Sequence, residues 1–245
     1  DMPQRLPYSH PLMSRASARA SLPAVVLGGG IAGLAAARLL ARHYPHVVVL
    51  ERDERPEVPT PEEAFAGWER PGVPQFRHSH AFLGRVRLVL LAHLPDVLDR
   101  LRLAGAREIG IAATVPPGMP FPPRADDEDV VLLACRRATF EWALRASVVG
   151  RDAITLREGV TVAGLEGEQR GGGRPTVTGV RLADGTVIPA ALVVDTTGRR
   201  SHAPQWLAAL GAPAPRERAV ETGIFYYTRF YRQRRARAPQ GTTGL

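Results

Sequence analysis

The stretch from Val25 to Glu51 constrains this chain more than any other. An apolar run at residues 25–27 leads into three consecutive glycines, and a helix-like segment then leads to a second apolar run, Val47–Leu50, which ends on Glu51. A strand, a tight glycine turn, a helix and a second strand that ends on an acid are the successive parts of a βαβ unit that binds a dinucleotide.

Each glycine of the Gly-x-Gly-x-x-Gly pattern has a mechanical task. Gly28 permits the sharp turn, Gly30 lets the backbone approach a pyrophosphate, and Gly33 lets the helix pack closely on the strand. The first amides of the helix, at Ile31 and Ala32, belong to an N-terminus whose free N–H groups and positive dipole end favour phosphate. The pattern therefore predicts a pyrophosphate site at this turn.

Glu51 follows the turn by about twenty residues, where an acid can accept the hydroxyls of a ribose. The alternative for residues 22–41 is a membrane span, since the segment is nearly all apolar and about long enough. Arg38 and Arg42 at its end, and the run Val47–Leu50, which is typical of a buried parallel strand, favour the βαβ interpretation.

Composition narrows the remaining classes. The 245 residues carry a net charge of +8, yet every basic residue is Arg and most are scattered. A nucleic-acid surface would gather arginines with aromatics on one face, so we expect no nucleic-acid partner and interpret the run at 232–237 as a solvated segment. The single Cys135 excludes an internal disulfide and predicts a free, buried thiol in a reducing cytoplasm.

Periodicity predicts the first half of the chain in outline. Residues 1–21 form a flexible leader, 53–77 and 116–129 are Pro-rich loops, and 79–93 have helical spacing. A further helix begins at Pro95-Asp96, with Asp96 as its N-cap and Gly105 as its C-cap.

The second half changes from helix to strand. A short strand at 130–133 precedes a helix with Phe140, Leu144 and Val148 at four-residue spacing. An antiparallel meander is then predicted from four strands and two turns, at 154–156, 160–165, 176–182 and 186–188, with turns at Gly171–Gly173 and Asp184-Gly185. A buried strand at 191–194 ends on Asp195-Thr196-Thr197-Gly198-Arg199, which is either a second cofactor contact or an ordinary turn.

Four stretches together resemble the FAD-binding part of the flavoprotein monooxygenase superfamily, in particular its bacterial branch of FAD-dependent epoxidases and hydroxylases. They are the glycine motif with Glu51-Arg52, the stretch Gly72–His80 with its Gln-x-x-His-x-His signature, the helix start at 135–142, and Asp195–Ser201 followed by Trp206-Leu207 and Gly211. The resemblance covers roughly residues 23–232, and the second and fourth stretches are its most specific parts.

The resemblance implies roles for individual residues. The cofactor FAD would be held by Gly28, Gly30, Ile31, Ala32, Gly33, Glu51, Arg52, Arg137, Val162, Asp195 and Gly198. Within that set, Arg137 would reach the phosphate–ribose region, with Arg136 as the alternative, and Val162 would present its backbone to the adenine. His78, His80 and Arg77 are weak candidates for the flavin or substrate side, and the catalytic residues stay unknown. No third ligand accompanies the histidine pair, so we expect no metal site.

The expected fold is α/β, a Rossmann-like parallel sheet with an antiparallel β-meander crossover. An FAD-binding domain would comprise 22–60 and 125–205, an inserted loop and helical segment 61–124, and an incomplete substrate-binding domain 206–245, whose first strand would lie at 222–232. Full members of the superfamily are about twice as long and carry a Gly-Asp segment that nothing here matches, so we expect a fragment or a truncated product.

The function implied by the resemblance is that of an FAD-dependent monooxygenase. Such an enzyme reduces FAD with NAD(P)H, forms a flavin C4a-hydroperoxide with O₂ and hydroxylates or epoxidises a small organic substrate, such as one of secondary metabolism. The alternatives are an FAD-dependent reductase of isoprenoid type, a halogenase, an NAD-binding dehydrogenase, and a truncated flavoprotein without turnover. The oligomeric state cannot be predicted from the sequence.

Overall fold

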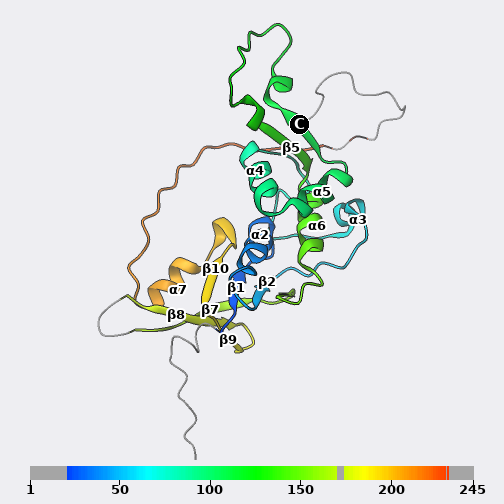
Figure 1. The fold of residues 1–245 in the computed structure, drawn as a ribbon. Helices are drawn as coiled ribbons and strands as arrows, with labels where there is room; N and C mark the ends of the chain where they lie inside the picture. Colours follow the sequence, from blue (N-terminus) through cyan, green and yellow to red (C-terminus); the bar gives the residue numbers. More distant parts are fainter. Residues whose placement is uncertain (1–20, 170–173, 230, 232–245) are drawn as a thin grey trace, which may run out of the picture.

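The protein was analysed as a computed structural model, which describes residues 21–169, 174–229 and 231 (Figure 1). The glycine turn predicted at 171–173, the arginine run at 232–237 and all but the last residue of the predicted leader lie outside the described residues. The helices are α2 (Ile31–Leu40), α3 (Pro61–Gly67), α4 (Gly84–His93), α5 (Pro95–Leu103), α6 (Arg137–Val148) and α7 (Ala203–Ala209). The strands are β1 (Ala24–Leu27), β2 (Val47–Leu50), β3 (Ser79–Phe82), β4 (Arg107–Gly110), β5 (Val131–Arg136), β6 (Ile154–Arg157), β7 (Val162–Glu168), β8 (Thr176–Leu182), β9 (Val187–Pro189) and β10 (Leu192–Asp195).

A parallel sheet of order β10-β1-β2-β6 forms the centre of the fold. Val26 of β1 is in register with Val194 of β10 on one side and with Val49 of β2 on the other. The residues of β1 and β2 are buried throughout, as their uninterrupted apolar runs predicted. The predicted α/β fold and its βαβ unit are therefore confirmed.

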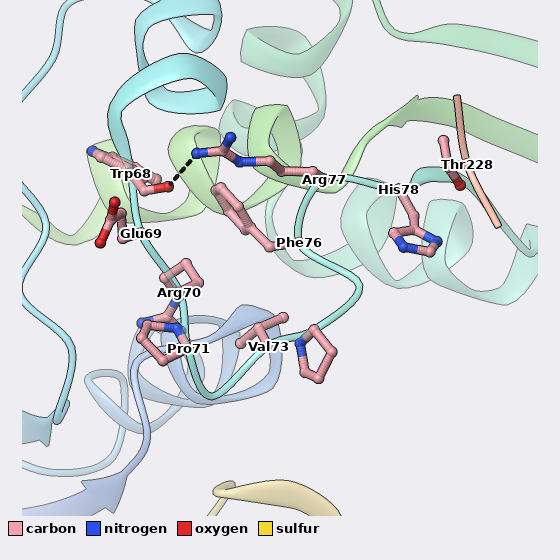
Figure 2. Close-up of a pocket in the computed structure, with 10 residues that line it drawn as sticks. Trp68, Glu69, Arg70, Pro71, Val73, Phe76, Arg77, His78 and Thr228 are labelled. Atoms are coloured by element: carbon pink, nitrogen blue, oxygen red, sulfur yellow. Dashed lines mark hydrogen bonds between the residues drawn. The ribbon is translucent and has the colours of Figure 1, made fainter. Parts of the chain in front are cut away.

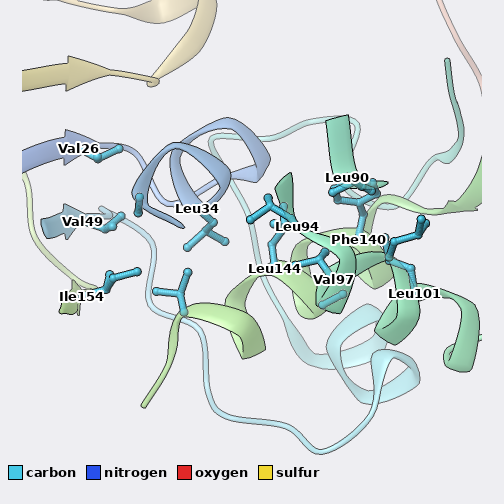
Figure 3. Packing of buried hydrophobic residues seen from close by; sticks show 14 of the residues in the cluster. Val26, Leu34, Val49, Leu90, Leu94, Val97, Leu101, Phe140, Leu144 and Ile154 are labelled. Atoms are coloured by element: carbon cyan, nitrogen blue, oxygen red, sulfur yellow. The ribbon is translucent and has the colours of Figure 1, made fainter. Parts of the chain in front are cut away.

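The two faces of this sheet bury different partners. Because side chains alternate along a strand, Val26 and Val49 enter one hydrophobic cluster and Val25 and Val48 enter another. The first cluster joins the sheet to α2, α4, α5 and α6 (Figure 3). The second joins it to the strands β7 and β8 and to α7, which lie on the opposite side in Figure 1. The sheet is thus the middle layer of three.

The crossover from β6 back to β10 is an antiparallel meander of order β7-β8-β9. Its β8–β9 hairpin turns at Asp184-Gly185, where Gly185 has φ +86°, as the sequence predicted. The assignment of the strand at 154–156 to this meander was wrong. That strand, β6, pairs in parallel with β2, and Ile154 packs into the helical cluster, so the meander begins only at β7.

A third sheet, of order β3-β5-β4, lies beyond the helices. The helix predicted over 79–93 begins only at Gly84, because residues 79–82 pair with β5 in the antiparallel direction. Asp96 is not the N-cap of α5. Leu94 holds that position and Pro95 follows it, while the Asp96 carboxylate instead binds the Arg38 guanidinium of α2 at 2.8 Å and 3.0 Å.

The predicted loop at 53–77 contains the short helix α3. Thr60 caps it by accepting a hydrogen bond from the Glu63 amide, and the Glu63 carboxylate accepts one from the Thr60 amide in return. This reciprocal pair is a capping box, and Pro61 occupies the first helical position. Seven residues are too few for apolar periodicity to reveal a helix, so only the caps could have indicated it.

Two further features complete the fold. Residues 213–229 contain neither helix nor strand, so the strand predicted across 222–232 does not form in its described part. Cys135 is a free, half-buried thiol on β5, the middle strand of its sheet, and burial raises its pKa to about 12. Within the described ranges, no helix combines the length and the apolar character needed to cross a bilayer.

Candidate dinucleotide-binding site

The glycine turn has the geometry that the sequence predicted. Gly28 has φ +96°, a left-handed conformation that favours glycine, and its amide donates to the Leu50 carbonyl at 2.8 Å. A Cβ at Gly33 would lie 1.8 Å from the Gly28 carbonyl oxygen, so α2 packs against the turn too closely for any side chain at this position. A Cβ at Gly30 would meet only Arg70 Nη2, 3.9 Å away. The turn is thus packed behind Gly33 and open beside Gly30.

Thr196 joins the glycine turn to the end of β10. Its hydroxyl lies 2.7 Å from the Leu27 carbonyl oxygen and 3.0 Å from that of Gly28, and its amide donates to Leu27. The turn is therefore held from the neighbouring parallel strand. The sequence placed Thr196 in a candidate cofactor segment but did not predict its contact with the glycine turn.

Glu51 lies beneath the turn and is 7 % exposed. Its Oε2 accepts from the Gly29 amide at 2.8 Å and from Arg70 Nη2 at 3.1 Å, and its Oε1 accepts from the Asp53 amide at 3.0 Å. Burial opposes ionisation, but the Arg70 charge and these hydrogen bonds outweigh it and lower the pKa of Glu51. The carboxylate is therefore ionised and tied to the turn.

Arg70 lies at the centre of a buried charge cluster that the sequence analysis did not anticipate. Its Nη1 lies 3.0 Å from Asp53 Oδ2, and its Nε lies 3.3 Å from Glu141 Oε2. Burial disfavours its charge, but Glu141, Glu51 and Asp53 outweigh this effect and raise the pKa of Arg70. The guanidinium remains charged although its side chain is only 2 % exposed.

Arg55 lies on the other side of Glu141, with 3.7 Å between Nη1 and Oε2, and its Nε donates to Glu158 at 2.7 Å. Burial and the nearby Arg70 charge lower its pKa despite both carboxylates. We call Glu51, Asp53, Arg55, Arg70 and Glu141 the buried charge cluster. Several of its nitrogens, and Glu141 Oε2, lie at ion-pair distance without hydrogen-bond geometry.

The structure separates the predicted arginines. Arg137 Nε donates to Glu141 Oε1 at 2.9 Å, which places Arg137 beside the buried charge cluster. Arg136 instead lies over the Phe65 ring, 4.5 Å from its centroid. Arg52 projects outward, with a side chain 62 % exposed. Of the predicted arginines, Arg137 is the one that contacts a member of the buried charge cluster.

Val162, which was predicted to present its backbone to the adenine, lies at the start of β7. The Val162 backbone pairs with Leu182 inside the meander, while the amide of Val160 donates to the Glu51 carbonyl at 2.9 Å. Val160 is therefore the residue of this segment that contacts the end of β2.

The loop after β10 is organised around the exposed residue Asp195. Its carboxylate accepts from the Thr197 amide at 2.9 Å, from the Thr197 hydroxyl at 2.6 Å and from the Ser201 hydroxyl. Burial opposes ionisation, but these hydrogen bonds outweigh it and lower the pKa of Asp195. Gly198 has φ +82°, so the loop turns back immediately after the strand.

A cavity of about 560 Å³ lies beside the buried charge cluster (Figure 2). Arg70, Trp68 and Phe76 line it together with Arg77 and His78. The other lining residues are Glu69, Pro71, Val73, Pro74 and Thr228. Two of the three weak catalytic candidates thus share a cavity with Arg70.

His80 lies apart from this cavity. It is on β3 opposite Cys135, its Nδ1 lies 3.0 Å from the His78 carbonyl oxygen, and its ring stacks with Phe82. Among the described residues, no three His, Cys, Asp or Glu side chains are grouped as metal ligands.

The glycine turn, the acid at the end of β2 and the loop after β10 converge at the carboxyl ends of three adjacent parallel strands, where α/β sheets bind their ligands. Fold and site together have the arrangement of a Rossmann-like fold. Comparison with family models agrees, since the model described as an NAD(P)-binding Rossmann-like domain matches residues 26–82.

The fold was also compared with individual known proteins. The chain is 32% identical over 228 residues to protein Rv3254 of Mycobacterium tuberculosis, which covers 85% of this chain and 44% of that protein. It is also similar to a variant of PqsL from Pseudomonas aeruginosa with four substitutions, at a TM-score of 0.55 and 19% identity, over 82% of this chain and 48% of that one. PqsL is described as a probable FAD-dependent monooxygenase. The chain spans about half the length of each, and the predicted resemblance to the flavoprotein monooxygenases is confirmed at the level of the fold.

Proposed function

We propose that this chain binds FAD and forms the cofactor-binding part of an FAD-dependent oxidoreductase. Specifically, we propose an NAD(P)H-driven monooxygenase that acts with O₂ on a small organic substrate. The observation that carries the proposal is the convergence of the glycine turn, Glu51 and the Asp195 loop at adjacent strand ends, beside a cavity that contains a buried arginine.

The residues present fit a dinucleotide. The space beside Gly30 is open, so a pyrophosphate can approach the first amides of α2. Arg70 Nη1 and Nε are buried without hydrogen-bond partners among the described residues, and such donors gain most from an anionic acceptor. Arg137, at the edge of the same cluster, is 17 % exposed and accessible to a ligand.

The residues of this chain would bind and orient the cofactor. Gly28, Gly30 and Gly33 with the amides of Ile31 and Ala32 would hold the pyrophosphate.

Glu51 would accept the ribose hydroxyls, Arg137 and Arg70 would face the phosphates, and the Asp195–Gly198 loop would form the second wall. Bound FAD supplies the transfer of electrons from NAD(P)H to oxygen, a chemistry that belongs to the cofactor. His78 and Arg77, in the cavity beside Arg70, would face the side of the flavin or the substrate.

A nicotinamide nucleotide is the second candidate, because the matching family model is named for NAD(P). Glu51 suits the ribose of either cofactor. An NAD-binding dehydrogenase needs no second wall formed by the Asp195 loop, which favours FAD.

The decisive experiment is the visible spectrum of the purified chain, followed by heat release and chromatographic identification of the cofactor. We expect one FAD per chain, or uptake of added FAD to that ratio. NAD(P) in place of FAD would overturn the proposal, and so would a purified chain that neither contains FAD nor takes up added FAD.

If FAD is bound, NAD(P)H oxidation and O₂ uptake distinguish the proposed chemistry from its rivals. Oxygen-dependent turnover on an organic substrate supports a monooxygenase. Reduction of an isoprenoid double bond without O₂, halide-dependent turnover, or binding without any turnover would each favour one of the alternatives.

A further inference from the structure

Glu141 is the most completely buried carboxylate of the described chain, and it contacts three arginines. Its side chain is 0 % exposed, its Oε1 accepts from Arg137 at 2.9 Å, and its Oε2 lies 3.3 Å from Arg70 and 3.7 Å from Arg55. A carboxylate without solvent is costly unless cations surround it, so its position in the middle of α6 requires an explanation.

The three arginines come from separate parts of the fold. Arg55 follows β2, Arg70 precedes β3, and Arg137 opens α6. The Arg70 guanidinium also reaches Glu51, and its Nη2 lies 3.9 Å from where a side chain at Gly30 would begin. Glu141 therefore links Arg70, which lies beside Gly30, to Arg137, which binds its other carboxylate oxygen.

Without Glu141, the positive charges of the three arginines would repel one another. The Arg70 charge lies close enough to Arg55 to affect its ionisation, and Arg70 would keep only Glu51 and Asp53 as partners. Arg137 would lose the hydrogen bond that fixes its first-turn guanidinium. Both guanidinium groups would then lose the carboxylate that holds them in their present positions.

We propose that Glu141 is a positioning residue that holds Arg70 and Arg137 toward the phosphates of the bound nucleotide. This inference rests on the proposed dinucleotide function, but not on the choice between FAD and NAD(P), since both carry the same adenosine diphosphate.

The direction of the effect distinguishes positioning from simple charge. Glu141→Gln removes a negative charge beside the phosphate site, so Coulombic attraction alone predicts tighter phosphate binding. Loss of positioning predicts the opposite, because a charge-assisted hydrogen bond to phosphate is lost with the geometry. The two explanations therefore differ in sign.

The test compares binding of ADP and of adenosine by calorimetry to the full chain. In the wild type, the phosphates should make ADP bind more tightly than adenosine. In Glu141→Gln, we expect this preference to fall about tenfold, the equivalent of ~1.4 kcal/mol, with adenosine affinity nearly unchanged. Glu158→Gln is the matched control, because it removes the same charge from the partner of Arg55 and Arg145 without contacting Arg70 or Arg137.

Other outcomes overturn the inference. An unchanged or increased ADP preference in Glu141→Gln would do so, as would an equal loss in Glu158→Gln or a wild type that does not prefer ADP. If Glu141→Gln does not fold, Glu141→Asp retains the charge but is one methylene too short to reach both arginines, and the same fall is expected. A wild type that binds ADP but not FAD would overturn the FAD proposal and leave this inference standing.

Discussion

Gly33 is the residue at which the nucleotide turn tolerates least change. In Gly33→Ala, the new methyl group would lie 1.8 Å from the Gly28 carbonyl oxygen and 2.7 Å from Thr196 Oγ1, both of which hold the turn. We expect a loss of at least ~1–3 kcal/mol in the free energy of unfolding, the usual cost of overpacking, and weaker nucleotide binding. Urea unfolding measures the first effect and ADP calorimetry the second.

Gly67→Ala is the matched control for this substitution. Gly67 ends α3, and a methyl group there would have no neighbour within 4 Å among the described residues. Stability should stay the same or rise by up to ~1 kcal/mol, because alanine favours helix. Equal losses of unfolding free energy at both positions would show that close packing at the glycine turn is not the cause of the effect.

Glu51 gives the site a defined pH dependence. Its folded pKa is lowered, so its stabilising effect is present above the unfolded pKa, about 4.3, and is lost as the pH falls through the folded pKa. Wild type should therefore exceed Glu51→Gln in unfolding free energy at neutral pH, and the difference should shrink below about pH 4. The comparison isolates Glu51 from Asp96 and Asp195, whose pKa values are also lowered. A difference that is constant with pH would contradict this account.

Among single residues, those whose role depends on neighbours close in the chain could be predicted from the sequence. The positions of Gly28 and Gly33 follow from one continuous turn and helix. Arg70 and Glu141 could not be predicted, because their ion pairs join positions 51, 70 and 141, which only the packing of α6 brings together. Arg70 lies two residues before the Gly72–His80 stretch and outside every predicted motif.

Among the elements, α3 depends most on its ends. Seven residues seldom form a stable helix alone, and the Thr60 hydroxyl satisfies one of the free amides at its start. Thr60→Ala should lower the free energy of unfolding by ~1 kcal/mol, while Thr60→Ser should retain most of the capping effect. Thermal unfolding of the two variants provides the check, and equal midpoints would exclude a capping role.

The elements that were predicted correctly are those with long apolar runs or strong helical spacing. β1, β2 and α6 are examples. The strand β3 was hidden inside a helical pattern because four residues carry little periodicity, and its partner β5 is about fifty positions away. The sheet to which β6 belongs depended in the same way on a distant partner, β2.

On the scale of the whole molecule, Phe140 connects the layers. It is 1 % exposed, its ring centroid lies 4.4 Å from that of Phe82 on β3, and it shares a cluster with the parallel sheet (Figure 3). Phe140→Ala should cost ~3–5 kcal/mol of unfolding free energy. Leu103→Ala, at a side chain 90 % exposed, should stay within about 0.5 kcal/mol.

The measurement for this pair is urea unfolding followed by circular dichroism and by tryptophan fluorescence. If the cluster unites the layers, both signals should shift together in Phe140→Ala. Separate transitions would mean that the two sheets unfold independently. Burial of the parallel sheet on both faces could be predicted from the sequence because β1 and β2 are uninterrupted apolar runs, whereas the additional β3-β5-β4 sheet could not.

Cys135 makes the middle strand of that additional sheet a chemical reporter. Only the thiolate reacts with disulfide reagents, and the raised pKa keeps this thiol protonated near neutral pH while the strand stays paired. Since the chain has one cysteine, the rate of thiol labelling would report how fast this sheet opens. Labelling should be slow in buffer and should accelerate when urea opens the sheet, whereas fast labelling of the native protein would show that β5 separates from its neighbours long before the rest unfolds.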